Sequence, residues 1–189
     1  MKAESLEKLR EEIVKDASLP LREANLVFGE GSPDAKVLFI GEAPGLNEDK
    51  LGRPFVGRAG KLLDEMLQKI GWKREDVYIT NIVKRRPPDN RDPLPEEIAA
   101  YKPYLKKQIQ IIDPDAIVTL GRFATNYFLP DARITRDQGK GFSFHGKLII
   151  PMLHPAAALR GNEMMGMFRE SFKKLPRLIE KWKTSPPAA

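Results

Sequence analysis

A strand followed by an abrupt turn constrains this chain more than any other feature. The apolar run at 37–40 has the β-branched and aromatic character of a buried strand, and it changes at once to Gly41-Glu42-Ala43-Pro44-Gly45. The glycines permit backbone angles that other residues avoid, while the proline fixes one dihedral. Because ligands bind beyond the carboxyl ends of strands in open parallel sheets, this turn is a candidate site. An ordinary strand-to-helix connection is the alternative.

Composition narrows the class of protein. The 189 residues suit one domain with its own core. No apolar run reaches membrane-spanning length and the charged N-terminus does not resemble a secretory signal, so we expect a cytoplasmic protein without membrane contact. A net charge of +6 weakly favours a polyanionic partner. The chain has no cysteine and only two histidines, His145 and His154, which excludes disulfides, thiolate metal sites and a His-rich metal site.

The alternation of apolar patterns predicts an α/β fold. Strands are expected at 36–40, 77–80, 116–120 and 147–152, and helices at 4–15, 59–70, 95–112, 121–128 and 162–183. Pro103 should kink or restart its helix, and residues 133–146 should form a loop or a hairpin. We therefore predict a doubly wound, mostly parallel four-stranded sheet with helices on both faces. Residues 1–183 would be a single domain and 184–189 a disordered tail.

Chemically distinctive residues follow three of the predicted strands, and they should converge because parallel strands end at one edge. The carboxamide of Asn81 matches a nucleobase edge that has a neighbouring carbonyl and N–H. An exposed Phe55 between arginines would suit stacking on a base, although it could instead belong to the core. His154 could donate to a carbonyl that gains negative charge, or it could simply cap the next turn. Glu42 supplies a carboxylate at the same edge.

Two further segments suit nucleic acid. The loop 84–91 carries Lys84, Arg86 and Arg91, and it is either a solvated loop or a rim that faces DNA. The run Pro155-Ala156-Ala157-Ala158-Leu159-Arg160 combines small residues with a leucine suited to act as a wedge and an arginine suited to contact phosphate. A pocket with an aromatic plate, an amide and a basic rim describes an enzyme that reads a flipped base.

Several ordered motifs resemble the family 4 uracil-DNA glycosylases, which are iron–sulfur enzymes of bacteria and archaea. The motifs are Gly41-Glu42-Ala43-Pro44-Gly45, Arg53-Pro54-Phe55-Val56-Gly57, Thr80-Asn81-Ile82-Val83-Lys84, Arg86-Pro87-Pro88 with Asn90-Arg91, and His154-Pro155. The resemblance implies hydrolysis of the N-glycosidic bond of deoxyuridine in single- or double-stranded DNA by a monomeric enzyme. The wider superfamily often has an aspartate where this chain has Ala43, so catalysis would depend mainly on stabilising the leaving group.

The resemblance also implies individual roles. Phe55 would stack on the extruded uracil, Asn81 would read its polar edge, and His154 would donate toward uracil O2. Glu42 would position water or the sugar cation. Backbone N–H groups near Glu42 and Ala43 would line the pocket, with Gly41 and Gly45 beside them. The segment 155–160 would enter the DNA at the lesion.

One departure from the family concerns its [4Fe–4S] cluster. By motif alignment, the four cluster cysteines are replaced by Asp16, Leu19, Arg85 and Tyr101, so we expect no cofactor. We also expect these side chains to meet, with Asp16 paired to Arg85 and the other two filling apolar volume. A metal-independent glycosylase is the favoured interpretation. The alternative is a catalytically weak uracil- or DNA-binding variant, or an engineered cluster-free scaffold. A nucleotide-phosphate enzyme is disfavoured because the chain has no glycine-rich phosphate loop.

Overall fold

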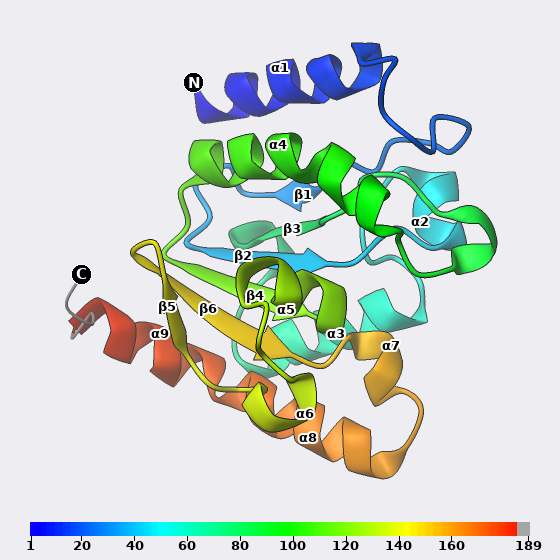
Figure 1. Ribbon diagram of the computed structural model, residues 1–189. Helices are drawn as coiled ribbons and strands as arrows, with labels where there is room; N and C mark the ends of the chain where they lie inside the picture. The colour runs from blue at the N-terminus through cyan, green and yellow to red at the C-terminus, as the bar shows by residue number, and fades with distance from the viewer. Residues whose placement is uncertain (185–189) are drawn as a thin grey trace.

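The computed structural model describes residues 1–184 and contains one mixed sheet covered by helices on both faces (Figure 1). The sheet has six strands in the order β1-β3-β2-β4-β6-β5, and the four inner strands are parallel. The strands are β1 Glu30–Gly31, β2 Val37–Gly41, β3 Tyr78–Asn81, β4 Ala116–Leu120, β5 Phe142–Phe144 and β6 Lys147–Met152. The α/β class and the four parallel strands predicted from the sequence are therefore confirmed.

The expectation of only four strands is wrong because two short antiparallel strands extend the sheet at its edges. Strand β1 pairs with β3 and β5 pairs with β6. The first has two residues and the second has three, which is too short for an alternating apolar pattern to show. The hairpin that was one of two interpretations of residues 133–146 is present as β5 and β6.

The helices match the predicted pattern in outline but differ from it in several places. They are α1 Lys2–Lys15, α2 Leu46–Leu51, α3 Arg58–Lys69, α4 Pro95–Ile112, α5 Arg122–Phe128, α6 Ile134–Asp137, α7 Pro155–Ala158, α8 Asn162–Lys173 and α9 Leu175–Thr184, with 3-10 turns η1 Arg74–Asp76 and η2 Pro88–Asn90. Helix α4 runs through Pro103 without restarting. The long helix predicted at 162–183 is two helices, and α2 lies within a predicted loop. Thr184 ends α9 rather than beginning a tail, and residues 185–189 lie outside the described part.

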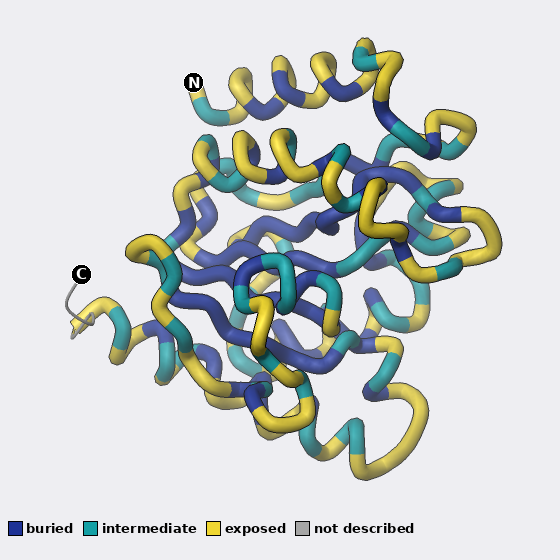
Figure 2. The backbone as a smooth tube through the Cα atoms, viewed as in Figure 1, coloured by how far each residue is buried: buried dark blue, intermediate teal, exposed yellow. Residues whose placement is uncertain are grey.

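Two apolar layers sandwich the sheet, and its inner strands are buried except at Lys147, the first residue of β6 (Figure 2). Alternate strand residues face opposite layers: Phe39 packs with α3, α8 and α9, whereas Leu38 and Ile40 pack with α1, α4 and α5. Covering both faces leaves the carboxyl edge of the parallel strands as the place where polar side chains reach the surface. No helix in the described range 1–184 has the length and apolar character needed to cross a bilayer.

Candidate active site

A cavity of about 600 Å³ opens at the carboxyl edge of the parallel strands. The side chains of Glu42, Phe55, Asn81 and His154 all line it, although they come from different segments of the chain. Ala43 and Gly45 line it too, whereas Gly41 lies beneath two of the lining side chains. The parallel register explains the convergence, because Gly41 at the end of β2 is paired directly with Asn81 at the end of β3.

The carboxamide of Asn81 is the best-defined polar group of the cavity. The residue is 2% exposed, and its Oδ1 has no hydrogen-bond partner within the described residues. A Cβ at Gly41 would lie 2.5 Å from this oxygen and 2.4 Å from Cζ of Phe55, so only glycine leaves room for both side chains. Leaving a buried acceptor unpaired costs about 1–3 kcal/mol. The amide is therefore poised to bond a ligand that enters the cavity.

Phe55 is buried rather than exposed, which corrects the expectation from its arginine neighbours. It is 5% exposed and belongs to the apolar cluster on the α3 side of the sheet, as the alternative interpretation held. It also lines the cavity, where its ring stacks against that of His154 with centroids 5.6 Å apart and planes at 27°. Burial and cavity lining are compatible because Phe55 both belongs to this cluster and borders the cavity. The ring thus presents a flat apolar wall.

His154 caps α7 and lines the cavity at the same time. Its Nδ1 accepts a hydrogen bond from the backbone N–H of Ala156 at 3.1 Å, so the capping alternative is confirmed. Burial lowers the pKa of the imidazole to about 4; nearby Glu48 opposes this shift and Arg160 adds to it. The ring is therefore neutral at pH 7, and with Nδ1 accepting, Nε2–H is its donor.

Glu42 lies between the turn after β2 and the start of α5. Its Oε1 accepts a hydrogen bond from the backbone N–H of Phe123 at 3.2 Å. A Cβ at Gly121, whose φ is +97°, would lie 2.3 Å from that oxygen, so glycine is required there. Burial raises the pKa of Glu42, and Asp92 raises it further, while the Phe123 N–H and Arg122 oppose the shift. The carboxylate is consequently more basic than a solvated one.

Sequence reasoning missed Glu48, whose carboxylate organises the cavity from α2. Its oxygens accept hydrogen bonds from the backbone N–H groups of Gly45 at 3.2 Å and of Val56 and Gly57 at 2.9 Å each. Glu48 lies three residues after Gly45, which precedes α2. That spacing is the glutamate half of a capping box, since Gly45 has no side chain to complete it, and this signal could have located Glu48. Asn90, Asp92 and Arg122 were also not predicted to line the cavity.

Comparison with known proteins agrees with the motifs at this edge. The sequence profile of the Uracil DNA glycosylase superfamily matches residues 28–177. The chain belongs to this superfamily. It is 48% identical over 187 residues to the type-4 uracil-DNA glycosylase of Sulfurisphaera tokodaii, covering 93% of this chain and 85% of the relative. It is 44% identical to the type-4 enzymes of Thermotoga maritima and Archaeoglobus fulgidus, covering 94% of this chain and 96% and 95% of those proteins.

The basic loop of this superfamily member is not the open rim that its charge suggests. Lys84 is fully buried, and its ammonium donates to Thr80 Oγ1 at 2.6 Å, to the Asn81 carbonyl at 2.9 Å and to Gln108 Oε1 at 2.6 Å. Arg85 is 6% exposed. Burial lowers the pKa of Lys84 well below its usual value. The predicted DNA contact by Lys84 is wrong, because the residue supports the strand end that carries Asn81.

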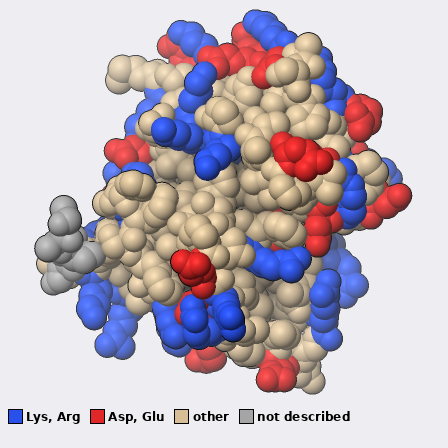
Figure 3. Space-filling model, in the orientation of Figure 1, with Lys and Arg blue, Asp and Glu red and all other residues tan. Residues whose placement is uncertain are grey.

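Some of the remaining residues that were predicted to contact DNA line the cavity, and others do not. Arg91 lines it but is held by Glu97 through bonds of 2.6 and 2.9 Å. Arg86 does not line it but donates to the side chain of Asn90, which does, at 2.6 Å. Ala156, Ala157 and Arg160 line it, whereas Pro155, Ala158 and Leu159 do not. The leucine is 37% exposed. Figure 3 shows acidic and basic side chains interspersed over the visible face, without a continuous basic surface.

The residues at the four positions expected to replace the cluster cysteines do not fit an iron–sulfur cluster. The chain has no cysteine, and these residues have other partners. Tyr101 is buried and donates its hydroxyl to the Pro20 carbonyl at 2.8 Å, and Arg85 donates to that hydroxyl at 3.3 Å. Leu19 is buried in the same apolar layer. The predicted pairing of Asp16 with Arg85 is wrong, because Asp16 accepts from Tyr104 at 2.5 Å and from Ser18.

Proposed function

We propose that this protein is a uracil-DNA glycosylase that draws deoxyuridine out of DNA and hydrolyses its N-glycosidic bond. One observation carries the proposal above all: the cavity pairs an unsatisfied, buried carboxamide at Asn81 with the aromatic wall of Phe55. An extruded uracil has a flat ring for the wall and a polar edge for the amide. Flipping costs a few kcal/mol and is cheapest for a mispaired base, which favours uracil opposite guanine.

His154 stabilises the leaving group in this proposal. As the bond between C1′ and N1 breaks, its electron pair passes to the uracil ring and negative charge develops on O2. The neutral imidazole donates its Nε2–H to that oxygen, while the Ala156 N–H on Nδ1 fixes the tautomer. A pKa of about 4 keeps the ring in this form at neutral pH. Preorganised donors of this kind are worth about 3–4 kcal/mol of barrier.

Glu42 acts on the sugar side of the reaction. As C1′ becomes an oxocarbenium ion, the carboxylate stabilises the cation and orients a water molecule for attack. The water adds its oxygen to C1′ and passes a proton to the Glu42 carboxylate, and the uracil anion takes up a proton from solvent. The products are an abasic site and free, neutral uracil, and Glu42 returns its proton to solvent. Ala43 offers no second carboxylate. The step therefore relies on the departing anion and on the raised basicity of one buried carboxylate.

The DNA duplex would approach over the cavity mouth. Arg160, Ala156 and Ala157 line that mouth, and exposed Leu159 lies beside them. We propose that Leu159 enters the helix where the nucleotide has left and that Arg160 contacts phosphate. Pro155 and Ala158 shape this segment, and Arg86 and Arg91 lie at the neighbouring loop. We further propose a cytoplasmic, monomeric enzyme, associated with the nucleoid when on DNA, with one domain over 1–183 and no metal cofactor.

Release of uracil from U:G duplex and single-stranded oligonucleotides, in EDTA, tests the proposal. Alkali then cleaves the abasic strand. The wild-type protein should give cleavage, while Asn81→Ala and His154→Ala should reduce release at least about a hundredfold with little change in duplex affinity. Undiminished release by both variants would refute the assigned roles. Binding without any release by the wild type would support the alternative, a uracil- or DNA-binding protein that has lost turnover.

A further inference from the structure

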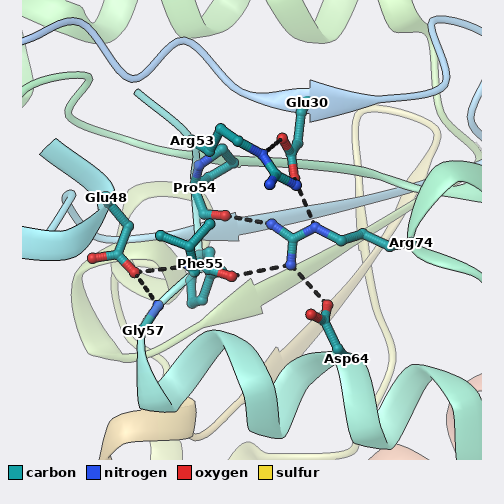
Figure 4. Close-up of polar contacts among 9 residues, drawn as sticks. Glu30, Glu48, Arg53, Pro54, Phe55, Gly57, Asp64 and Arg74 are labelled. Atoms are coloured by element: carbon teal, nitrogen blue, oxygen red, sulfur yellow. Dashed lines mark hydrogen bonds and ion pairs between the residues drawn. The ribbon is translucent and has the colours of Figure 1, made fainter. Parts of the chain in front are cut away.

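Arg74 lies outside the cavity but contacts the loop that carries Phe55 (Figure 4). It begins η1, and its side chain is 18% exposed. Its Nη1 donates to the carbonyl of Phe55 at 3.1 Å and its Nη2 donates to the carbonyl of Pro54. The guanidinium therefore holds two consecutive carbonyls from one side, while Glu48 holds the following N–H groups from the other.

Two carboxylates fix the guanidinium in turn. Nε of Arg74 donates to Glu30 on β1 at 2.7 Å, and Nη1 donates to Asp64 on α3 at 2.7 Å. A guanidinium is planar and presents several N–H donors in fixed directions, so these contacts set its orientation as well as its place. Arg74 thus joins the sheet edge, helix α3 and the loop at Phe55.

The backbone at Phe55 needs such support. Its φ is +49°, in the left-handed region that side chains other than glycine rarely adopt. The loop also packs so closely on α3 that a Cβ at Gly60 would lie 1.9 Å from the Phe55 oxygen. Strained backbone persists where the surroundings hold it in place. Here the contacts that hold it also set where the phenyl ring lies, above Gly41 and against His154.

We propose that Arg74 is the positioning residue for Phe55, holding the phenyl ring in its base-stacking position before DNA binds. The proposal rests on the proposed function, in which the ring stacks on uracil. Arg74 does not line the cavity, so it acts through the loop and has no contact with the base. Loss of its contacts would let the loop relax and move the ring from the cavity wall.

The kinetic test combines Arg74→Gln with Phe55→Ala. Single-turnover uracil release at saturating DNA should fall about tenfold to a hundredfold for Arg74→Gln, because small misplacements of binding groups have effects of this size. In the Phe55→Ala background the same change should cost less than about twofold, since coupled residues are not additive. Arg53→Gln is the matched control: Arg53 also pairs with Glu30, at 2.7 and 3.0 Å, but makes no contact with the Phe55 carbonyl. It should change release less than about twofold.

A second measurement needs no activity. The chain has two histidines, so imidazole labelled at Cε1 gives two NMR signals, one for each residue. The His154 signal feels the ring current of Phe55, whereas His145 stacks edge-on with Phe144, with centroids 4.4 Å apart, and serves as an internal reference. Arg74→Gln should shift the His154 signal and leave the His145 signal in place, and Arg53→Gln should shift neither. Should Arg74→Gln fail to fold, Asp64→Asn removes one brace and should shift His154 in the same direction.

The outcomes separate the two proposals. Equal losses for Arg74→Gln in both backgrounds, or an unmoved His154 signal in the folded variant, would overturn the role of Arg74 while wild-type release stands. If Arg74→Gln does not fold and Asp64→Asn is used instead, an unmoved His154 signal in Asp64→Asn would likewise overturn the role of Arg74. Absence of uracil release by the wild type would refute the proposed function, and a shifted His154 signal would still place the Phe55 ring under the control of Arg74.

Discussion

Asn81 and Phe55 line the same cavity but are held by different kinds of support. Asn81 ends a buried strand, and beneath it the Lys84 ammonium bonds only neutral oxygens. Phe55 lies on a loop, and the Arg74 guanidinium that holds it is braced by partly exposed carboxylates. The sheet and a buried lysine fix the amide, whereas partly exposed ion pairs fix the ring. Perturbing the first support should therefore damage folding most, and perturbing the second should damage catalysis more than stability.

The largest expected effect is at Lys84. Lys84→Met leaves the oxygens of Thr80, Asn81 and Gln108 buried without their donor. The free energy of unfolding should fall by about 3 kcal/mol, and uracil release should fall with it even at temperatures where the variant is folded. Chemical denaturation and single-turnover release measure the two effects. Arg53→Gln, which removes an exposed ion pair, is the control. Equal stability of both variants would contradict the claim that Lys84 supports folding more than the ion pairs near Phe55 do.

The next effect concerns the contact between α3 and the Phe55 loop. Gly60→Ala places a methyl group 1.9 Å from the Phe55 oxygen, so the loop must move, at a cost of about 2 kcal/mol. Gly166 in α8 has nothing within 4 Å of its Cβ position. Gly166→Ala should therefore stabilise by about 0.5–1 kcal/mol through helix propensity. Thermal unfolding compares the pair, and uracil release should fall only for Gly60→Ala. Similar stabilisation by both substitutions would contradict the close approach.

The pH profile sharpens the comparison because neither Phe55 nor Asn81 titrates. Glu42 acts as a carboxylate, and burial raises its pKa above 4.5, so release should fall about tenfold per unit as the pH drops below that raised pKa. His154 stays neutral until about pH 4 and should not cause this fall. Glu42→Gln should be slower and should lose the acid limb. An acid limb retained in Glu42→Gln would assign the titration to another group.

The smallest effect lies away from both supports. Tyr101→Phe removes the hydrogen bond to Pro20 at 2.8 Å and the contact with Arg85 at 3.3 Å. Stability should fall by about 1 kcal/mol, and uracil release by the folded variant should be unchanged. Denaturation and release in EDTA measure both. A loss of release matching that of Asn81→Ala would mean that this buried position, which is expected to replace a cluster ligand, controls the cavity after all.

The same contrast explains what the sequence could predict. The strand ends were accessible because apolar runs stop at Gly41 and Asn81, and parallel strands share an edge. The residues that support these strand ends and the Phe55 loop could not be predicted from the sequence. Arg74 lies 19 residues from the carbonyl it holds, and Gln108 lies 24 residues from Lys84. The basic character of residues 84–91 predicted a DNA-facing rim, but Lys84 in this run is fully buried. Local patterns predict elements and their ends, but contacts distant in sequence leave no periodic signal.

A crystal structure with free uracil tests the central claim most directly. The account predicts the uracil ring against Phe55, its polar edge bonded to the Asn81 carboxamide and its O2 facing His154, with Glu42 on the side where the sugar would lie. Uracil bound elsewhere on the protein, or in the cavity without a bond to Asn81, would contradict the account.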